Sequence, residues 1–157
     1  MGCTPTLSLS YDAAMSYRTV DPTQGKELVE EGWTYLDVRT VEEFGAGHPP
    51  GAYNIPFAVV DPSIGRMVAN PEFCDVVKKT FQPGDQLVVS CAAGGRSMHA
   101  CELLVAEGYS NLVNMHGGFS GARDMSGVVL QDGWEALGYP TTDEPQADRT
   151  YDALRGA

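Results

Sequence analysis

The sequence predicts an α/β domain built on a largely parallel β-sheet. Short runs of β-branched and other apolar residues alternate with helical stretches, as expected when helices connect parallel strands. The 157 residues suit a single domain, and 43% apolar residues are enough for a hydrophobic core. We therefore expect an N-terminal tail at 1–17, one folded domain at 18–142 and an acidic C-terminal tail at 143–157.

Helix and strand signals follow one another through this domain. Asp21, Pro22 and Gln24 are the capping residue, the first-turn proline and the capping-box residue of a helix that Gly32 ends. The apolar runs expected to form strands lie at 33–38, 52–55, 87–90 and 111–115. Helical segments are expected at 41–44, at about 70–81 and at 97–107.

Charge and composition exclude several classes of function. With 21 acidic and 10 basic residues, the formal charge of −11 disfavours binding to nucleic acid or to an anionic membrane. No apolar run approaches the ~18 residues that span a bilayer, and the first positive charge, Arg18, comes too late for a secretory signal. Four cysteines argue against a disulfide scaffold and favour the cytoplasm. The scattered histidines predict no metal site.

The residues from Leu87 to Ser97 carry the clearest chemical signal. Ligands of parallel α/β sheets bind at the carboxyl ends of strands, and Cys91 follows such an end directly. Gly94 and Gly95 let successive N–H groups turn inward, and the helix that begins near Ser97 adds the positive end of its dipole. These groups form an anion-binding loop around the cysteine.

Arg96 adds a full positive charge to the same loop. Together, these groups favour the thiolate of Cys91, which predicts a nucleophile that faces an anionic substrate. A cysteine and an arginine at this spacing arise easily by chance, so a buried strand-end cysteine is the competing interpretation. The strand–loop–helix context favours the site.

Motifs elsewhere in the chain resemble those of rhodanese domains. The stretches Tyr35–Arg39, Glu42–Phe44 and Gly47–Pro56 resemble the paired signatures of that family. The loop Cys91–Ser97 resembles its active-site loop, and Gly117–Phe119 its glycine-aromatic motif. The resemblance runs from about Arg18 to Thr142, with the motifs in the family's order.

The resemblance implies a rhodanese-like domain with a five-stranded parallel sheet flanked by helices. It implies a sulfurtransferase that carries sulfur as a persulfide on Cys91, without a cofactor. The partners are then a small sulfur donor, such as thiosulfate or an organic persulfide, and a thiol or protein acceptor. The substrate-binding residues implied are Ala92, Ala93, Gly94, Gly95, Arg96 and Ser97.

Loop length distinguishes two readings of this resemblance. Six residues run from Cys91 to Arg96, as in members that form persulfides, whereas related phosphatases and arsenate reductases generally have seven. Some plant rhodanese-like proteins with the short loop are linked to arsenate reduction, so arsenate reductase is one alternative. A sulfur carrier or binding module without turnover is the other.

The chain departs from the family pattern in two places. Many members that use thiosulfate have a basic or polar residue after the cysteine, where this chain has Ala92, so an organic or protein persulfide suits the loop better. The usual tryptophan after the glycine-aromatic motif is absent, and residues 124–133 read as an inserted loop. We expect Trp134 to pack where that tryptophan would lie.

The remaining candidates favour structural roles. Asp37 and Arg39 end a strand near the site, and we expect them to hold neighbouring loops by charge-assisted hydrogen bonds. We expect His48 to anchor its loop and His99 to face solvent. Ser97 either caps the helix or bonds the sulfur. We expect four further residues to lie in the core: Cys74, Cys101, Trp33 and Tyr35.

Overall fold

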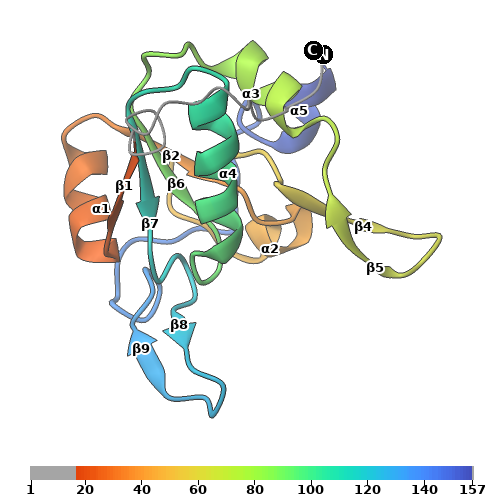
Figure 1. Cartoon of the computed structure of the whole chain (residues 1–157). Helices are drawn as coiled ribbons and strands as arrows, with labels where there is room; N and C mark the ends of the chain where they lie inside the picture. The colour runs from red at the N-terminus through yellow and green to blue at the C-terminus, as the bar shows by residue number, and fades with distance from the viewer. Residues whose placement is uncertain (1–16, 157) are drawn as a thin grey trace.

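The chain folds around five parallel strands. The computed structural model describes residues 17–156, so nearly all of the predicted N-terminal tail lies outside the described residues. The strands are β1 (Tyr17–Val20), β2 (Thr34–Asp37), β3 (Tyr53–Asn54), β6 (Leu87–Ser90) and β7 (Leu112–Met115). Their order is β1-β7-β6-β2-β3, and each neighbouring pair is parallel (Figure 1). The predicted five-stranded parallel sheet is confirmed.

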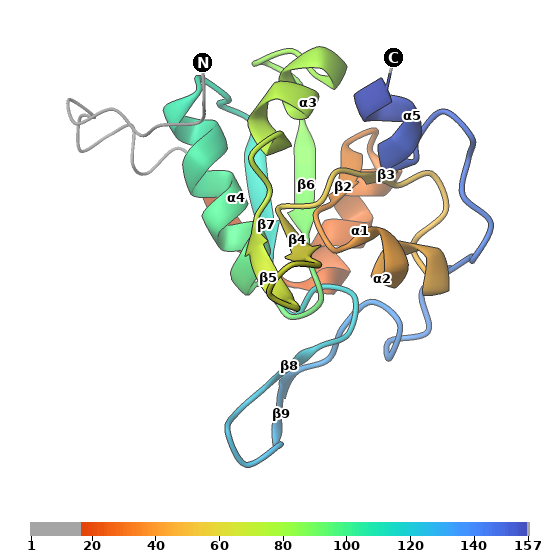
Figure 2. The ribbon, with the colours of Figure 1, turned by 90° about the vertical axis from the view of Figure 1, so that its right-hand side faces the viewer.

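Helices cover both faces of the sheet. They are α1 (Pro22–Glu30), α2 (Val41–Ala46), α3 (Phe73–Thr80), α4 (Gly95–Ala106) and α5 (Tyr151–Gly156). Figure 1 shows α1 and α4 on opposite sides of the sheet, and Figure 2 shows α3 on the same side as α4. No helix among residues 17–156 is long and apolar enough to cross a bilayer.

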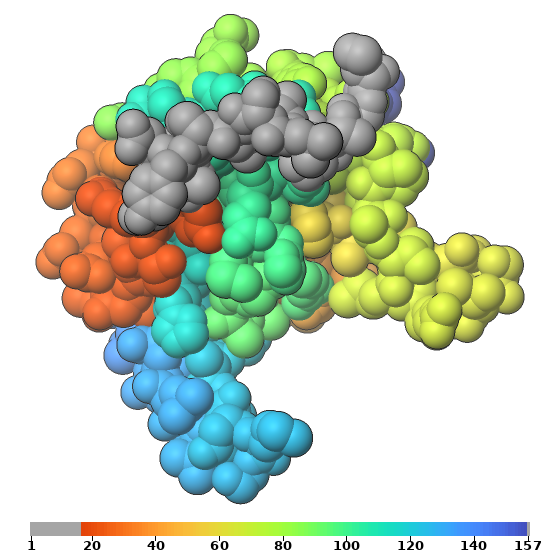
Figure 3. Space-filling model, viewed as in Figure 1, coloured from red at the N-terminus to blue at the C-terminus, as the bar shows by residue number. Residues whose placement is uncertain are grey.

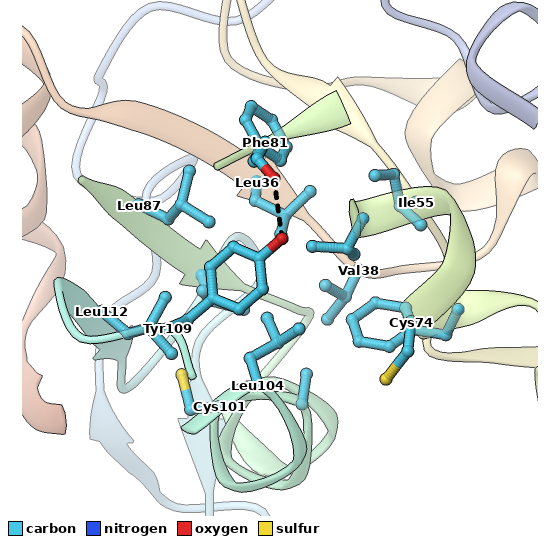
Figure 4. Close-up of a cluster of buried hydrophobic side chains, with 14 of the residues drawn as sticks. Leu36, Val38, Ile55, Cys74, Phe81, Leu87, Cys101, Leu104, Tyr109 and Leu112 are labelled. Carbon is cyan, nitrogen blue, oxygen red and sulfur yellow. Dashed lines mark hydrogen bonds between the residues drawn. The ribbon is translucent and has the colours of Figure 1, made fainter. Parts of the chain in front are cut away.

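Alternating strand residues build two cores, one on each face. Leu36 and Leu87 point toward α4, where they join Leu104 (Figure 4). Val77 of α3 and Val89 belong to the same core. On the opposite face, the sheet residues pack with α2 and with the segment that follows β7; this second core contains Val20, Tyr35, Phe44, Ala52, Val88, Val113, Met115, Phe119 and Trp134. Both cores include side chains from the segments that border the candidate site.

The helix signals at Asp21 are confirmed. Asp21 accepts a bond from the Gln24 amide, and the Gln24 side chain accepts one from the Asp21 amide, which completes the capping box. The helix that follows β6 begins at Gly95, two residues earlier than predicted. Its cap, Gly94, has a φ of +124°, a conformation that favours glycine.

Two hairpins project from the body of the molecule. One pairs β4 (Ala58–Asp61) with β5 (Arg66–Ala69), and the other pairs β8 (Ala122–Arg123) with β9 (Val129–Gln131). Figure 3 shows both standing clear of the body. The second hairpin contains most of the predicted loop at 124–133, and its side chains Met125, Val128 and Leu130 are exposed.

The predicted acidic tail at 143–157 is wrong for its last residues. Residues 151–156 form α5, which contacts α3, and Tyr151 is buried in the core. The Arg149 carbonyl accepts a bond from the Asn54 amide, which ties this segment to β3. At the other end, Tyr17 belongs to β1 rather than to a tail. Both segments were assigned to tails because, in the sequence, their few buried residues lie among exposed polar ones.

Candidate active site

The candidate site lies at the carboxyl end of the central strands. Cys91 follows β6 immediately, and the loop that it begins leads into the first turn of α4. β6 lies between β2 and β7, so residues after all three strands meet at this edge. The structure therefore brings the loop together with the segments after Asp37 and Met115.

Backbone amides surround the sulfur of Cys91. The Gly94 and Ser97 amides each donate to its Sγ, at 3.1 and 3.4 Å, and the Ser97 hydroxyl lies 3.5 Å away. Both amides belong to the loop and the first turn of α4, where the helix dipole favours negative charge. The sequence predicts that amides of this loop turn toward the Cys91 sulfur, and these two amides do so.

Further loop amides are available to a ligand. Among residues 17–156, the amides of Ala93, Gly95 and Arg96 have no hydrogen-bond acceptor. The first amides of a helix lack partners within the helix, which is why such ends bind anions. The loop can therefore hold a sulfur atom or a small oxyanion next to Cys91.

The segment after β7 fixes the loop from behind. The Phe119 amide donates to the Cys91 carbonyl at 2.9 Å, and the Ser120 amide to the Ala92 carbonyl at 2.8 Å. The Gly117 amide donates to the Ala93 carbonyl at 2.8 Å. Because these three loop carbonyls are bound on one side, the loop amides are left to face the other.

Gly118 allows this close approach. Its φ is +51°, and a Cβ at this position would collide with the Cys91 and Ala92 carbonyls. The glycine-aromatic motif of the sequence is therefore a support for the cysteine loop.

Arg96 is bound to a carboxylate. Its two terminal nitrogens donate to the two carboxylate oxygens of Glu43, at 2.8 and 3.0 Å. Partial burial opposes ionisation of Glu43, but the bonds from Arg96 and Thr40 outweigh it and lower the pKa of Glu43 to about 2. Glu43 thus offsets the positive charge that Arg96 gives to the loop. The sequence analysis did not select Glu43 as a site residue.

Ser97 lies against the sulfur and does not cap the helix. It is the third residue of α4, whose cap is Gly94. Its hydroxyl is 2.5 Å from Oδ1 of Asn114 and 3.1 Å from the Gly94 carbonyl oxygen. Asn114 on β7 was also not selected from the sequence, because a single asparagine within a strand gives no signal of its own.

Asp37 and Arg39 form a buried pair, as expected. Arg39 donates to both carboxylate oxygens of Asp37, at distances from 2.7 to 3.1 Å, and to the Gly47 carbonyl. Burial raises the pKa of Asp37 and the bonds from Arg39 act against that rise. The Arg39 guanidinium also lies over the Phe119 ring, so the pair connects three loops around the site.

Most of the other candidates lie where the sequence predicts, but Trp33, expected in the core, is only partly buried. His48 is buried, stacks on Phe44 and exchanges backbone bonds with Thr142, which anchors its loop. His99 faces solvent. Cys74 and Cys101 lie in the core (Figure 4), and burial raises the pKa of the Cys101 thiol. No cluster of three or more His, Cys, Asp or Glu suited to a metal occurs among residues 17–156.

Comparison with known proteins identifies the family. The model of the family "Rhodanese-like domain" matches residues 21–124, about two thirds of the chain and the part that contains Cys91, its loop and the supporting segment after β7. This chain belongs to the rhodanese-like family. The resemblance of its motifs is thereby confirmed.

Curated relatives of this rhodanese-like protein include several from Arabidopsis thaliana. Thiosulfate sulfurtransferase 18 is 43% identical over 103 residues, which cover 64% of this chain and 74% of the relative. Thiosulfate sulfurtransferase 16, chloroplastic, is 36% identical over 123 residues, which cover 78% and 91%. Protein HIGH ARSENIC CONTENT 1, mitochondrial, is 42% identical over 102 residues, which cover 65% of this chain but only 59% of the relative.

Solved structures show the same fold. The M. tuberculosis protein Rv0390 has a TM-score of 0.66 at 24% identity, over 81% of this chain and 98% of that one. A rhodanese-related protein from Thermoplasma volcanium has a TM-score of 0.58 at 27% identity, over 82% and 100%.

The second core of this rhodanese-like domain also contains Trp134. Trp134 is buried and packs edge-on against Tyr35 and Tyr139. It shares the second core with Phe119, which places it behind the motif that supports the cysteine loop.

Proposed function

We propose that this rhodanese-like protein is a sulfurtransferase that carries sulfane sulfur as a persulfide on Cys91. The observation that carries the proposal is the ring of amides around Cys91 Sγ, with two bonds already made and further amides free. A terminal persulfide sulfur is a small anion of the kind that such a ring stabilises. Relatives named thiosulfate sulfurtransferase support the same chemistry.

The reaction has two steps. The Cys91 thiolate attacks the outer sulfur of the donor, a new S–S bond forms, and the donor's S–S bond breaks. With thiosulfate, the electron pair of that bond leaves on sulfite; with an organic persulfide, it leaves on a thiolate. A second nucleophile, cyanide in an assay or a thiol on a small molecule or a protein, then removes the outer sulfur and restores the Cys91 thiolate.

Each loop residue has a role in this scheme. Ala92, Ala93, Gly94 and Gly95 supply the backbone that curves around the sulfur, and Ser97 adds an amide at 3.4 Å. Arg96 contributes its backbone amide to donor binding, and Asp37 and Arg39 act only as structural support. Cys91 is only 2% exposed, so a donor must present a narrow terminal sulfur to reach it.

Steady-state turnover tests the proposal. Wild-type protein should form thiocyanate from cyanide and either thiosulfate or an organic persulfide, with parallel lines in double-reciprocal plots, and Cys91→Ser should form none. Thiocyanate formation by the serine variant at the wild-type rate would contradict the scheme. Sulfur loading without turnover, followed by transfer to a protein thiol, would instead indicate a carrier.

Arsenate reduction is the second candidate. It is supported by the relative named HIGH ARSENIC CONTENT 1, which is 42% identical. A thiol-coupled assay with arsenate distinguishes the two reactions, since an arsenate reductase should produce arsenite at a rate above that of thiocyanate formation.

We also propose, from the low cysteine content, that the protein is located in the cytoplasm. Subcellular fractionation tests this location, since two relatives carry "mitochondrial" or "chloroplastic" in their names.

A further inference from the structure

The loop of Cys91 has one cationic side chain, and that cation is already paired. Both terminal nitrogens of Arg96 point to Glu43, which leaves them in a two-bond fork with its carboxylate. The two residues lie 53 positions apart in the chain, so the pair is made by the fold rather than by neighbouring sequence. The pair as a whole carries no net charge.

Glu43 is itself held in place. Its Oε1 accepts bonds from the Thr40 amide at 3.0 Å and the Thr40 hydroxyl at 3.1 Å, as part of the capping box that starts α2. The low pKa of Glu43 means that it stays ionised at neutral pH. The carboxylate is therefore a fixed negative charge beside the loop.

The second arginine at this edge of the sheet is also matched. Arg39 is bound to Asp37, and both are almost completely buried. The loop residues next to Cys91, Ala92 and Ala93, are uncharged. A donor that approaches Cys91 thus meets free amides and a positive helix end, while both arginines described here, Arg96 and Arg39, each have a carboxylate partner.

We propose that Glu43 is a specificity-determining residue that makes this site select sulfur donors of low charge, such as organic persulfides and thiosulfonates, over the dianion thiosulfate. The inference rests on the proposed sulfurtransferase function and names the donor class for it. Glu43 repels each negative charge of the donor and holds the guanidinium that would attract it, so the penalty grows with the donor's charge.

Two donors isolate the effect of charge. Thiosulfate has two negative charges and methanethiosulfonate has one, yet each offers the same kind of outer sulfur. Attack by the Cys91 thiolate yields the same persulfide from both, and the leaving group is sulfite from the first and methanesulfinate from the second. In each case the thiolate forms one S–S bond, one S–S bond of the donor breaks, and the leaving group takes the electron pair.

The variant Glu43→Gln removes the charge and retains the shape. The amide oxygen can still accept from Thr40, so the cap of α2 is kept. Glu42→Gln is the matched control, because Glu42 is the exposed neighbour in the same turn and has no hydrogen bond or ion pair among residues 17–156. Thermal unfolding checks that each variant is folded.

The measurement is kcat/KM for each donor at low ionic strength. Wild type should prefer methanethiosulfonate, and E43Q should raise the ratio of thiosulfate to methanethiosulfonate activity about tenfold, an effect that shrinks as salt is added. Glu42→Gln should leave the ratio unchanged. A wild-type preference for thiosulfate, an unchanged ratio in E43Q, or an equal loss with both donors would overturn the proposal.

Alkylation separates this inference from the proposed function. The rates at which Cys91 reacts with iodoacetate, an anion, and with neutral iodoacetamide are compared by mass spectrometry in wild type and E43Q. The ratio of the two rates should rise about fivefold in E43Q, whether or not sulfur is transferred. If wild type transfers sulfur from neither donor, the proposed function fails, and an unchanged alkylation ratio overturns the role of Glu43 by itself.

Discussion

At the scale of single residues, the environment of Cys91 depends on atoms that are far apart in the sequence. Two amides from its own loop bind the sulfur, while amides from residues 117–121 bind the loop carbonyls. The first group could be predicted from the local pattern of strand, glycines and helix. The second could not be derived in this way, because nothing in Gly117–Phe119 itself indicates which carbonyls it will meet.

Gly118→Ala tests this support directly. A Cβ at a φ of +51° is strained, and it would press on the Cys91 and Ala92 carbonyls. We expect a loss of about 2 kcal/mol in unfolding free energy and a fall in thiocyanate formation of about tenfold or more. Urea unfolding and the turnover assay measure these.

Gly65→Ala is the control for backbone strain alone. Gly65 has a φ of +69°, and nothing lies within 4 Å of an added Cβ. This variant should lose some stability and keep full activity. Equal activity losses in the two variants would show that the contact of Gly118 with the loop does not matter.

The pair of Glu43 and Arg96 predicts a pH-dependent contribution to stability. The pKa of Glu43 in the folded protein is about 2, below its ordinary value of 4.5, so the carboxylate stabilises the fold above pH 4.5 and the contribution is lost as pH falls toward 2. Because the Glu43 side chain is 36% exposed, we expect only about 1 kcal/mol between wild type and Glu43→Gln at pH 7. Urea unfolding should show the difference shrink between pH 4.5 and 2; a constant difference would contradict the assignment.

At the scale of secondary-structure elements, some helices position residues of the site and others complete the core. α4 presents its amino end to Cys91 and buries Ala100, Cys101 and Leu104 in the core, so the site is held by a helix that is anchored in the core. α2 is only six residues long but positions Glu43 through its capping box. α5 completes the core near α3, although it lies outside the stretch that the family model matches.

Tyr151→Ala tests whether α5 belongs to the folded domain. Tyr151 is buried, and its hydroxyl accepts a bond from the Asn70 side chain. Removing the ring should lower the free energy of unfolding by about 3 kcal/mol, whereas Asp152→Ala, at an exposed position of the same helix, should change it by less than about 0.5 kcal/mol. If both variants unfold like wild type, α5 adds nothing to the core.

At the scale of the whole molecule, the sequence predicts the central strands of the sheet better than the peripheral elements. The central strands β6 and β7 are buried along their whole length and consist mainly of apolar residues, so they are recognisable from residue type. β1 was missed because an edge strand with the burial pattern of Tyr17–Val20 exposes its polar residues. α5 and the hairpin at β4 and β5 were missed because few of their residues are buried.

The same distinction applies to the site. The place of Cys91, between β6 and α4, could be predicted because strand, loop and helix are contiguous in the chain. Glu43 and Asn114 reach the loop only through tertiary contacts, at separations of 53 and 17 residues from Arg96 and Ser97. Glu43 also fits a capping box, which is sufficient reason for a glutamate at that position and conceals its second role.

The most direct test of the account is the mass of the intact protein after exposure to sulfur donors. Wild type is incubated separately with thiosulfate and with a low-molecular-weight persulfide, beside Cys91→Ser. We predict that wild type gains one sulfur atom, that cyanide removes it, and that the serine variant gains none. A wild-type mass that neither donor changes, or a sulfur atom that the serine variant also retains, would contradict a persulfide on Cys91.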